Sequence, residues 1–375
     1  MRERLPGGMV ASEFLRRHWQ RKPLLVRGAF PGVGAWPGKR KLFTLAARPD
    51  VESRLISRSG RRWSVAHGPL VHTLLARQRT RNWTLLVHGV NHHCTDVERL
   101  LRCFSWLPHA RLDDVMVSFA VPGGGVGAHY DAYDVFLVQG PGRRVWRLEP
   151  PRRFAEVSGA PLRLIADFAP QEEYLLEPGD MLYLPPGWGH DGVALEPSFT
   201  YSIGFRAPRV AELAVAMLDD LHERGFPGRE YRDPGLRVTR HPAQIGSRML
   251  RFAEDAMRAI RSSRATARSS LGRFLTTPKQ HVVFERPVHP RTRARFLARL
   301  RSCAVRLDPR TQLLYCGDRF FLNGEEMRPR KTQASALARL ADRREAGGRA
   351  LARCGAGDLL YAWYQDGYIH LEPAA

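Results

Sequence analysis

The chain of 375 residues is longer than one typical domain, and its composition, 43% apolar and 26% charged, is that of a folded protein rather than a disordered one. It contains no run of about eighteen apolar residues, no secretory leader and no CxxC pair among its five cysteines, so we expect a cytoplasmic protein without membrane span, disulfide framework or zinc ribbon. The net charge of +22 suits an anionic partner such as nucleic acid, but an arginine bias typical of GC-rich genomes explains the same surplus.

The N-terminal third mixes helices and strands. Residues 10–30 are predicted to form a short amphipathic helix and then the strand "PLLVRG", with Pro23 at the boundary. A second helix and strand are predicted in "GPLVHTLLARQRTRNWTLLVHGV".

From Asp113 onward the pattern is one of short strands separated by Gly and Pro turns. "DDVMVSFAV", "DVFLVQG", "RRVWRLEPP", "EEYLLEPGDMLYLPPGW" and "FTYSIGFRAP" all carry apolar residues in strand-like runs. This spacing predicts an antiparallel sandwich or barrel.

Two amphipathic helices are predicted after Pro208. Each carries apolar residues at helical spacing: Val210, Leu213, Met217, Leu218 and Leu221 in the first, and Met249, Phe252, Ala256, Met257 and Ile260 in the second. A Pro-rich loop between them leaves this region with little core of its own, which favours a homodimer.

A last unit opens near Thr277. It alternates the helix "TRARFLARLRS", the strands "AVRLD", "QLLYCG" and "RFFLNG", the helix "ASALARLADRRE", and a final helix and strand. Three helices with a small sheet are compatible with a winged-helix module. The predicted organisation is therefore α+β, with a barrel domain in residues 1–207, a helical dimerisation region in 208–276 and a winged helix in 277–375.

Polar residues in the barrel strands predict a metal site. His129 and Asp131 are two positions apart in an extended segment, so their side chains point to the same side. His190 follows a rigid Pro-Pro corner in "LPPGWGH" and supplies a third ligand. Two imidazoles and one carboxylate on a β scaffold form the facial triad that binds non-haem Fe(II) with positions left open.

The open positions need a co-substrate. 2-Oxoglutarate would fill two through its keto-acid end and dioxygen the third, which leaves a distal carboxylate to be neutralised. Arg144, one strand after the metal motif, is placed to pair with it, and Ser198 and Thr200 are placed to complete the cradle. Arg143 should point the other way, into solvent. No catalytic side chain beyond the metal site is predicted.

At these residues the sequence resembles the Jumonji-C oxygenases, and within them the ribosomal oxygenases. The resemblance is carried by "DDVMVSFAVPGGGVGAHYDAYDVFLVQGPGRRVWRL", "LEPGDMLYLPPGWGHDGVALE" and "YSIGFRAP", and it continues more weakly to "LNGEEMRP". It implies a double-stranded β-helix of the cupin type, a helical dimerisation region and a C-terminal winged helix. It also implies dependence on iron and 2-oxoglutarate, with His129, Asp131 and His190 as metal ligands.

The implied reaction is hydroxylation of an arginine β-carbon in ribosomal protein L-sixteen of the large subunit. An arginine substrate would need an acidic or aromatic wall near the iron, for which Tyr130, Tyr133 and Asp134 are the nearest candidates. Each of them is equally compatible with a packing residue of the barrel or a surface residue.

Three alternatives stay open. A histidyl hydroxylase, or another Jumonji-C oxygenase acting on a basic protein or RNA, keeps the chemistry and changes the substrate. A winged-helix regulator that binds nucleic acid would use the barrel as a sensor. A cupin-type enzyme without 2-oxoglutarate would leave Arg144 without a role. The segment "NHHC" at residues 91–94 has metal-ligand types but lacks a metal-ligand spacing, so it is predicted to be loop.

Overall fold

The computed structural model describes residues 4–76, 80–223, 225, 230–232, 245, 247–260 and 264–373. Its contacts divide the chain into two compact units, the first made of residues 1–207 and 279–285 and the second of 208–278 and 286–375. The described helices offer no segment long and apolar enough to cross a membrane. The five cysteines are free.

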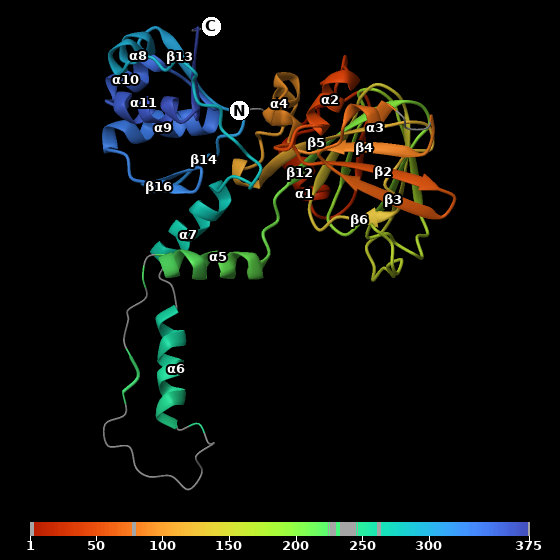
Figure 1. The fold of residues 1–375 in the computed structure, drawn as a ribbon, viewed down its shortest axis with the longest axis horizontal. Coiled ribbons are helices and arrows are strands. Elements are labelled where there is room, and N and C mark those ends of the chain that lie inside the picture. Colours follow the sequence, from red (N-terminus) through yellow and green to blue (C-terminus); the bar gives the residue numbers. More distant parts are fainter. Residues whose placement is uncertain are drawn as a thin grey trace. The chain divides into compact units, whose positions relative to one another are not determined.

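The first unit is built on an antiparallel double sheet (Figure 1). Its strands are β1 Leu24–Val26, β2 Ser53–Ser59, β3 Arg62–His67, β4 Trp83–Val87, β5 Leu112–Ala120, β6 His129–Tyr130, β7 Val135–Gln139, β8 Arg144–Glu149, β9 Glu172–Leu176, β10 Met181–Leu184, β11 Gly189–Ala194 and β12 Ser198–Phe205. The larger sheet has the order β1-β10-β7-β12-β5-β4-β2-β3 and the smaller one β6-β11-β8-β9. The predicted antiparallel barrel is confirmed.

Helices and turns of the N-terminal half accompany these sheets. They are α1 Ala11–Arg17, α2 Lys39–Ala46, α3 His72–Ala76, α4 Thr95–Arg102 and the 3-10 turns η1 Val90–His92 and η2 His109–Arg111. The helix and strand predicted in residues 10–30 are confirmed as α1 and β1, and those predicted next as α3 and β4. The sequence analysis did not predict α2, α4 or the hairpin of β2 and β3, which lie side by side at one edge of the large sheet (Figure 1).

The two faces of the large sheet bury different cores. Phe136, Tyr183 and Phe205 pack with Phe14 of α1 and Phe104 in one extended apolar cluster. The opposite face, with Leu137 and Leu182, joins the smaller sheet through a second cluster that includes Trp146 and Leu148. Because strand residues alternate between faces, this second cluster lies between the two sheets, inside the barrel.

The second unit holds helices and two small sheets. The helices are α5 Val210–Glu223, α6 Ser247–Ile260, α7 Arg264–Thr276, α8 Arg293–Leu300, α9 Lys331–Arg343, α10 Gly348–Arg353 and α11 Gly357–Gln365, and the strands are β13 Cys303–Leu307, β14 Leu313–Cys316, β15 Arg319–Leu322, β16 Glu325–Met327, β17 Glu345–Gly347 and β18 Ile369–Pro373. The sheets have the orders β17-β13-β18 and β14-β15-β16. The elements predicted after Thr277 are confirmed, and α7, α10, β16 and β17 are additional.

The two helices predicted after Pro208 are confirmed as α5 and α6, and α7 lies against α5 (Figure 1). Several of their apolar side chains are exposed: 85% of Val210, 59% of Val215 and 72% of Met257. The Pro-rich link predicted between α5 and α6 lies largely outside the described residues.

Tyr183 joins the N-terminal segment to the barrel. Its buried hydroxyl donates a hydrogen bond of 2.6 Å to the Asp134 carboxylate and accepts one of 2.7 Å from the backbone N–H of Gln20. Burial and the Asp134 acceptor both raise the pKa of Tyr183, so the hydroxyl keeps its proton.

We expect Tyr183→Phe to lower the free energy of unfolding by about 1–3 kcal/mol, because it leaves a buried carboxylate and a backbone N–H short of a partner. Chemical denaturation measures this change. Tyr174→Phe is the matched control, since among the described residues that hydroxyl bonds Glu172 alone, at a part-exposed position, and its loss should change stability by less than about 0.5 kcal/mol. Equal effects of the two substitutions would contradict this account of Tyr183.

Candidate metal centre

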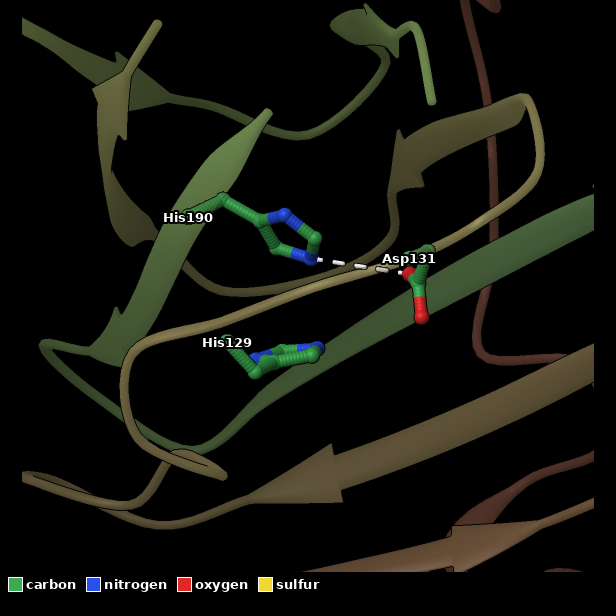
Figure 2. A group of neighbouring side chains, drawn as sticks. All are labelled: His129, Asp131 and His190. Carbon is green, nitrogen blue, oxygen red and sulfur yellow. Dashed lines mark ion pairs between the residues drawn. The ribbon is translucent and has the colours of Figure 1, made fainter. Parts of the chain in front are cut away.

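Three predicted ligands converge inside the barrel. β6 carries His129 and leads into Asp131, while β11 carries His190 directly opposite His129 in the strand pairing. One ligand atom from each of the three lies within 4.8 Å of the others. The two imidazole centroids are 4.2 Å apart, and His190 Nε2 lies 3.7 Å from Asp131 Oδ2 (Figure 2). Among the described residues this is the group of His, Cys, Asp and Glu side chains with the geometry to hold a metal ion.

Hydrogen bonds to backbone carbonyls orient both imidazoles. Nδ1 of His129 lies 2.8 Å from the Gly127 oxygen, and Nδ1 of His190 lies 3.0 Å from the Trp188 oxygen. A carbonyl oxygen only accepts, so each Nδ1 carries a proton, and Nε2 is the nitrogen that each ring turns toward the other ligands. Burial and the nearby His129 lower the pKa of His190 to about 4, so its ring is neutral at pH 7.

This donor set fits a divalent transition metal. Two neutral imidazoles and one carboxylate form the ligand set of non-haem Fe(II) sites, with ligands on one side of the ion and the other positions open. Asp131 is additionally fixed through its backbone oxygen, which accepts a 2.8 Å hydrogen bond from the N–H of Gly187.

Arg144 is a buried cation without a carboxylate partner among the described residues. Its side chain is 3% exposed, and its guanidinium donates to Ser118 Oγ at 3.1 Å and to Ser198 Oγ at 3.3 Å. Burial lowers its pKa to about 10, so it stays charged at pH 7. Neutral hydroxyls do not balance a buried charge, so this pocket is suited to an anion.

Of the residues near Arg144, some are buried beside it and one is exposed. Arg143 is exposed and pairs with Glu196 at 2.9 Å, as its predicted orientation requires. Thr200 is buried on the same strand face as Ser198, and its hydroxyl bonds Gln139 Oε1 at 3.3 Å. The sequence analysis missed Ser118, because it lies on β5, far from the metal motif, and no sequence pattern shows that β5 pairs with β12.

The three predicted substrate contacts lie in different environments. Tyr130 and Tyr133 are each 42% exposed, and burial together with the Asp131 carboxylate raises the pKa of Tyr133. Asp134 is fully buried and accepts hydrogen bonds from Tyr183, from Gln20 at 3.0 Å and from Arg111 at 3.0 Å. The carboxylate of Asp134 therefore ties the end of the metal-binding loop to the N-terminal segment.

The segment of residues 91–94 is not a loop throughout. Its first two residues belong to the 3-10 turn η1, and Cys94 is the N-cap of α4. The prediction of loop was therefore wrong for those residues, since a short 3-10 turn has no sequence period to reveal it. The His and Cys side chains of this segment lie outside the group of His129, Asp131 and His190 found among the described residues.

The barrel, the triad and the winged-helix unit define a Jumonji-C oxygenase. The family profile described as JmjC domain matches residues 99–213, and that described as ROXA-like winged helix matches residues 257–370. A third profile, AraC-like ligand binding domain, matches residues 169–275, which begin in the same barrel.

More specifically, the chain belongs to the ribosomal oxygenases. It is 35% identical to the ribosomal protein uL16 3-hydroxylase of Escherichia coli, over 87% of this chain and 88% of that protein. A probable ribosomal oxygenase of Haemophilus influenzae is 33% identical over 63% of this chain and 57% of its own length. Both the fold class and the family resemblance inferred from the sequence are thereby confirmed.

Solved structures of a ribosomal oxygenase match this chain over nearly its whole length. The X-ray structure of E. coli YcfD matches with a TM-score of 0.87 and 32% identity, over 97% of this chain and 98% of the other. YcfD in complex with cobalt and 2-oxoglutarate matches with a TM-score of 0.83 and 32% identity, over 96% and 98% of the two chains.

We expect cobalt(II) to stabilise the folded protein through the triad. At a hundredfold excess over the dissociation constant, a ligand that binds only the folded state raises the free energy of unfolding by about 2.7 kcal/mol. Denaturation with and without cobalt(II) measures the gain, which His190→Ala should abolish. His92→Ala is the control, and a gain that survives in His190→Ala but disappears in His92→Ala would place the metal elsewhere.

Proposed function

We propose that this protein is an Fe(II)- and 2-oxoglutarate-dependent dioxygenase that hydroxylates the β-carbon of an arginine in ribosomal protein uL16. The observation that carries the proposal is that one barrel holds both a 2-His-1-carboxylate triad and the buried cation Arg144, which has no carboxylate partner among the described residues. The similarity to a uL16 3-hydroxylase supports the choice of substrate.

Separate residues bind the metal and the co-substrate. His129, Asp131 and His190 hold the iron, which when bound supplies the activation of dioxygen and the oxidation of a C–H bond at the expense of 2-oxoglutarate. Arg144 binds the distal carboxylate of 2-oxoglutarate, and the Ser118 and Ser198 hydroxyls fix the guanidinium.

Other parts of the site receive the substrate and exclude water. The apolar side chains of the barrel interior, Leu137, Leu148, Leu182 and Leu184 among them, keep water from the reacting centre. Thr200 completes the cradle from the same face as Ser198. Tyr130 and Tyr133, half-exposed beside Asp131, contact the substrate side chain, whereas Asp134 acts as an internal anchor.

The decisive experiment is mass spectrometry of a uL16 fragment incubated aerobically with this protein, Fe(II) and 2-oxoglutarate. We expect one added oxygen on an arginine, together with succinate, and neither with His190→Ala. An added oxygen on a histidine would replace arginine by histidine as the target. Consumption of 2-oxoglutarate without a modified fragment would discard uL16, and no consumption at all would favour a nucleic-acid-binding regulator.

The adjacent arginines provide a matched pair of variants. Arg144→Ala should raise the Michaelis constant for 2-oxoglutarate about ten- to hundredfold, the range for losing hydrogen bonds to a charged group. Arg143→Ala should leave it unchanged, because that side chain is exposed and pairs with Glu196. Steady-state kinetics at saturating Fe(II) measure both. Unchanged kinetics in Arg144→Ala would point to a metal enzyme that uses no 2-oxoglutarate.

We also propose that the helical region 208–276 forms a homodimer. The exposed apolar side chains of α5 and α6 support this proposal, since a large exposed apolar surface typically marks an interface. The three-part division into residues 1–207, 208–276 and 277–375 and a cytoplasmic location, where ribosomal proteins are met, belong to the same proposal.

Replacement of Val210 and Met257 by Asp should convert the dimer to monomer, because charge at an apolar interface leaves carboxylates desolvated. Light scattering measures the mass. Leu195→Asp, at an exposed residue of the barrel unit, is the control and should leave the dimer intact. A wild-type monomer at micromolar concentration would refute the dimer.

A further inference from the structure

Trp146 lies on the part of the barrel wall that separates the metal triad from Arg144. On β8, Arg144, Trp146 and Leu148 share one face, and they pair with Ala194, Gly192 and His190 of β11. The Trp146 and His190 ring centroids are 6.0 Å apart. A molecule that reaches from the triad to Arg144 therefore passes over the Trp146 indole.

Gly192 lets the indole lie close to the wall. A Cβ atom at Gly192 would come within 2.6 Å of the six-membered ring of Trp146, so a larger residue there would push the ring away from β11. The absence of a side chain at Gly192 thus allows the flat indole to lie against the backbone of β11.

The indole N–H is buried and has no acceptor among the described residues. Trp146 is 6% exposed, and Nε1 makes no hydrogen bond to any described part of the chain. Its neighbours in the barrel interior, such as Leu137 and Leu182, are apolar and offer no acceptor. A buried unpaired donor is costly, and the place of this one between the triad and Arg144 points to an acceptor on a molecule bound there.

We propose that Nε1 of Trp146 donates a hydrogen bond to an oxygen of bound 2-oxoglutarate. The inference rests on the proposed function and adds a residue to it. The oxygens of 2-oxoglutarate lie at its two ends and the carbons between them are methylene groups, so the acceptor is a carboxylate oxygen. This hydrogen bond fixes the rotation of the co-substrate about its long axis, and the indole face lies against the methylene groups and excludes water. Trp146 is thus a co-substrate-binding residue. Neither the metal motif nor Arg144 reveals this role in the sequence.

The test is calorimetric titration of 2-oxoglutarate, without oxygen, into cobalt(II)-loaded protein. Trp146→Phe removes the donor, and replacement of Trp146 by 3-benzothienylalanine removes it without changing ring size. Both should raise the dissociation constant of 2-oxoglutarate about tenfold or more, the usual cost of losing a hydrogen bond to a charged acceptor, and leave cobalt(II) affinity unchanged.

Trp106→Phe is the matched control. Trp106 also has a buried indole nitrogen without a partner among the described residues, but it packs against the core on the outer side of the large sheet. Its replacement should not change 2-oxoglutarate affinity.

The outcomes separate this inference from the proposed function. Wild-type protein that fails to bind 2-oxoglutarate would refute the proposed function, and the inference with it. Wild-type binding with unchanged affinity in the benzothienylalanine protein would refute the inference alone. A parallel loss of cobalt(II) affinity in both Trp146 variants would also overturn it, since it would show Trp146 to be only a packing residue of the barrel.

Discussion

The buried positive charge of Arg144 is the constraint on which the interior of the barrel depends. A guanidinium that is 3% exposed and whose described hydrogen bonds all go to uncharged oxygens, those of the Ser118 and Ser198 hydroxyls and of the Ser198 backbone, is unfavourable unless an anion joins it. The fold holds it in place through two strands of the large sheet, β5 with Ser118 and β12 with Ser198. The surroundings of Arg144 are therefore suited to an anion.

The barrel interior is divided along β8 and β11. The polar end contains Arg144, the middle contains Trp146 over Gly192, and the far end contains His190 with the rest of the triad. Two imidazoles and a carboxylate offer metal ligands at one end, and the Arg144 cation offers a partner for an anion at the other. This order matches a dicarboxylate that chelates a metal with one end and forms an ion pair with the other.

The N-terminal segment supports the metal-binding loop from outside the barrel. Asp134 closes that loop three residues after the ligand Asp131, and its carboxylate binds Tyr183, Gln20 and Arg111. Arg111 also donates to the backbone oxygen of Arg206 at the end of the barrel, at 2.6 Å. This part-buried network holds Asp134 in place, and with it the end of the loop that carries Asp131.

Much of the site could be predicted from the sequence, because its chemistry is local. His129 and Asp131 share a strand face by simple alternation, His190 follows a recognisable Pro-Pro corner, and Arg144 opens the next strand. Ser118 could not be predicted, because its place beside Arg144 depends on the pairing of β5 with β12. The place proposed for Trp146 could not be predicted either, because it depends on the pairing of β8 with β11 and on the missing side chain of Gly192. The sequence also could not show that Asp134 is a buried anchor while Tyr130 and Tyr133 are half-exposed. The alternation of strand residues between faces does not reveal a hydrogen-bond partner as distant in the chain as Tyr183.

The fold shows the same limits. The strands from β5 to β12 have apolar runs and strong turn signals, which predicted an antiparallel barrel. The hairpin of β2 and β3 carries arginines and serines along much of its length and has only a partly buried face, so its alternation is weak. α7 has few apolar positions of helical spacing, and its packing against α5 and β15 is set by tertiary contacts.

A crystal structure with cobalt(II) and 2-oxoglutarate, grown without oxygen, tests the central claim most directly. The account predicts cobalt bound by Nε2 of His129, Nε2 of His190 and a carboxylate oxygen of Asp131, with the distal carboxylate of 2-oxoglutarate paired with Arg144. Cobalt at the triad with Arg144 still lacking an anion, or 2-oxoglutarate bound away from the barrel interior, would contradict it.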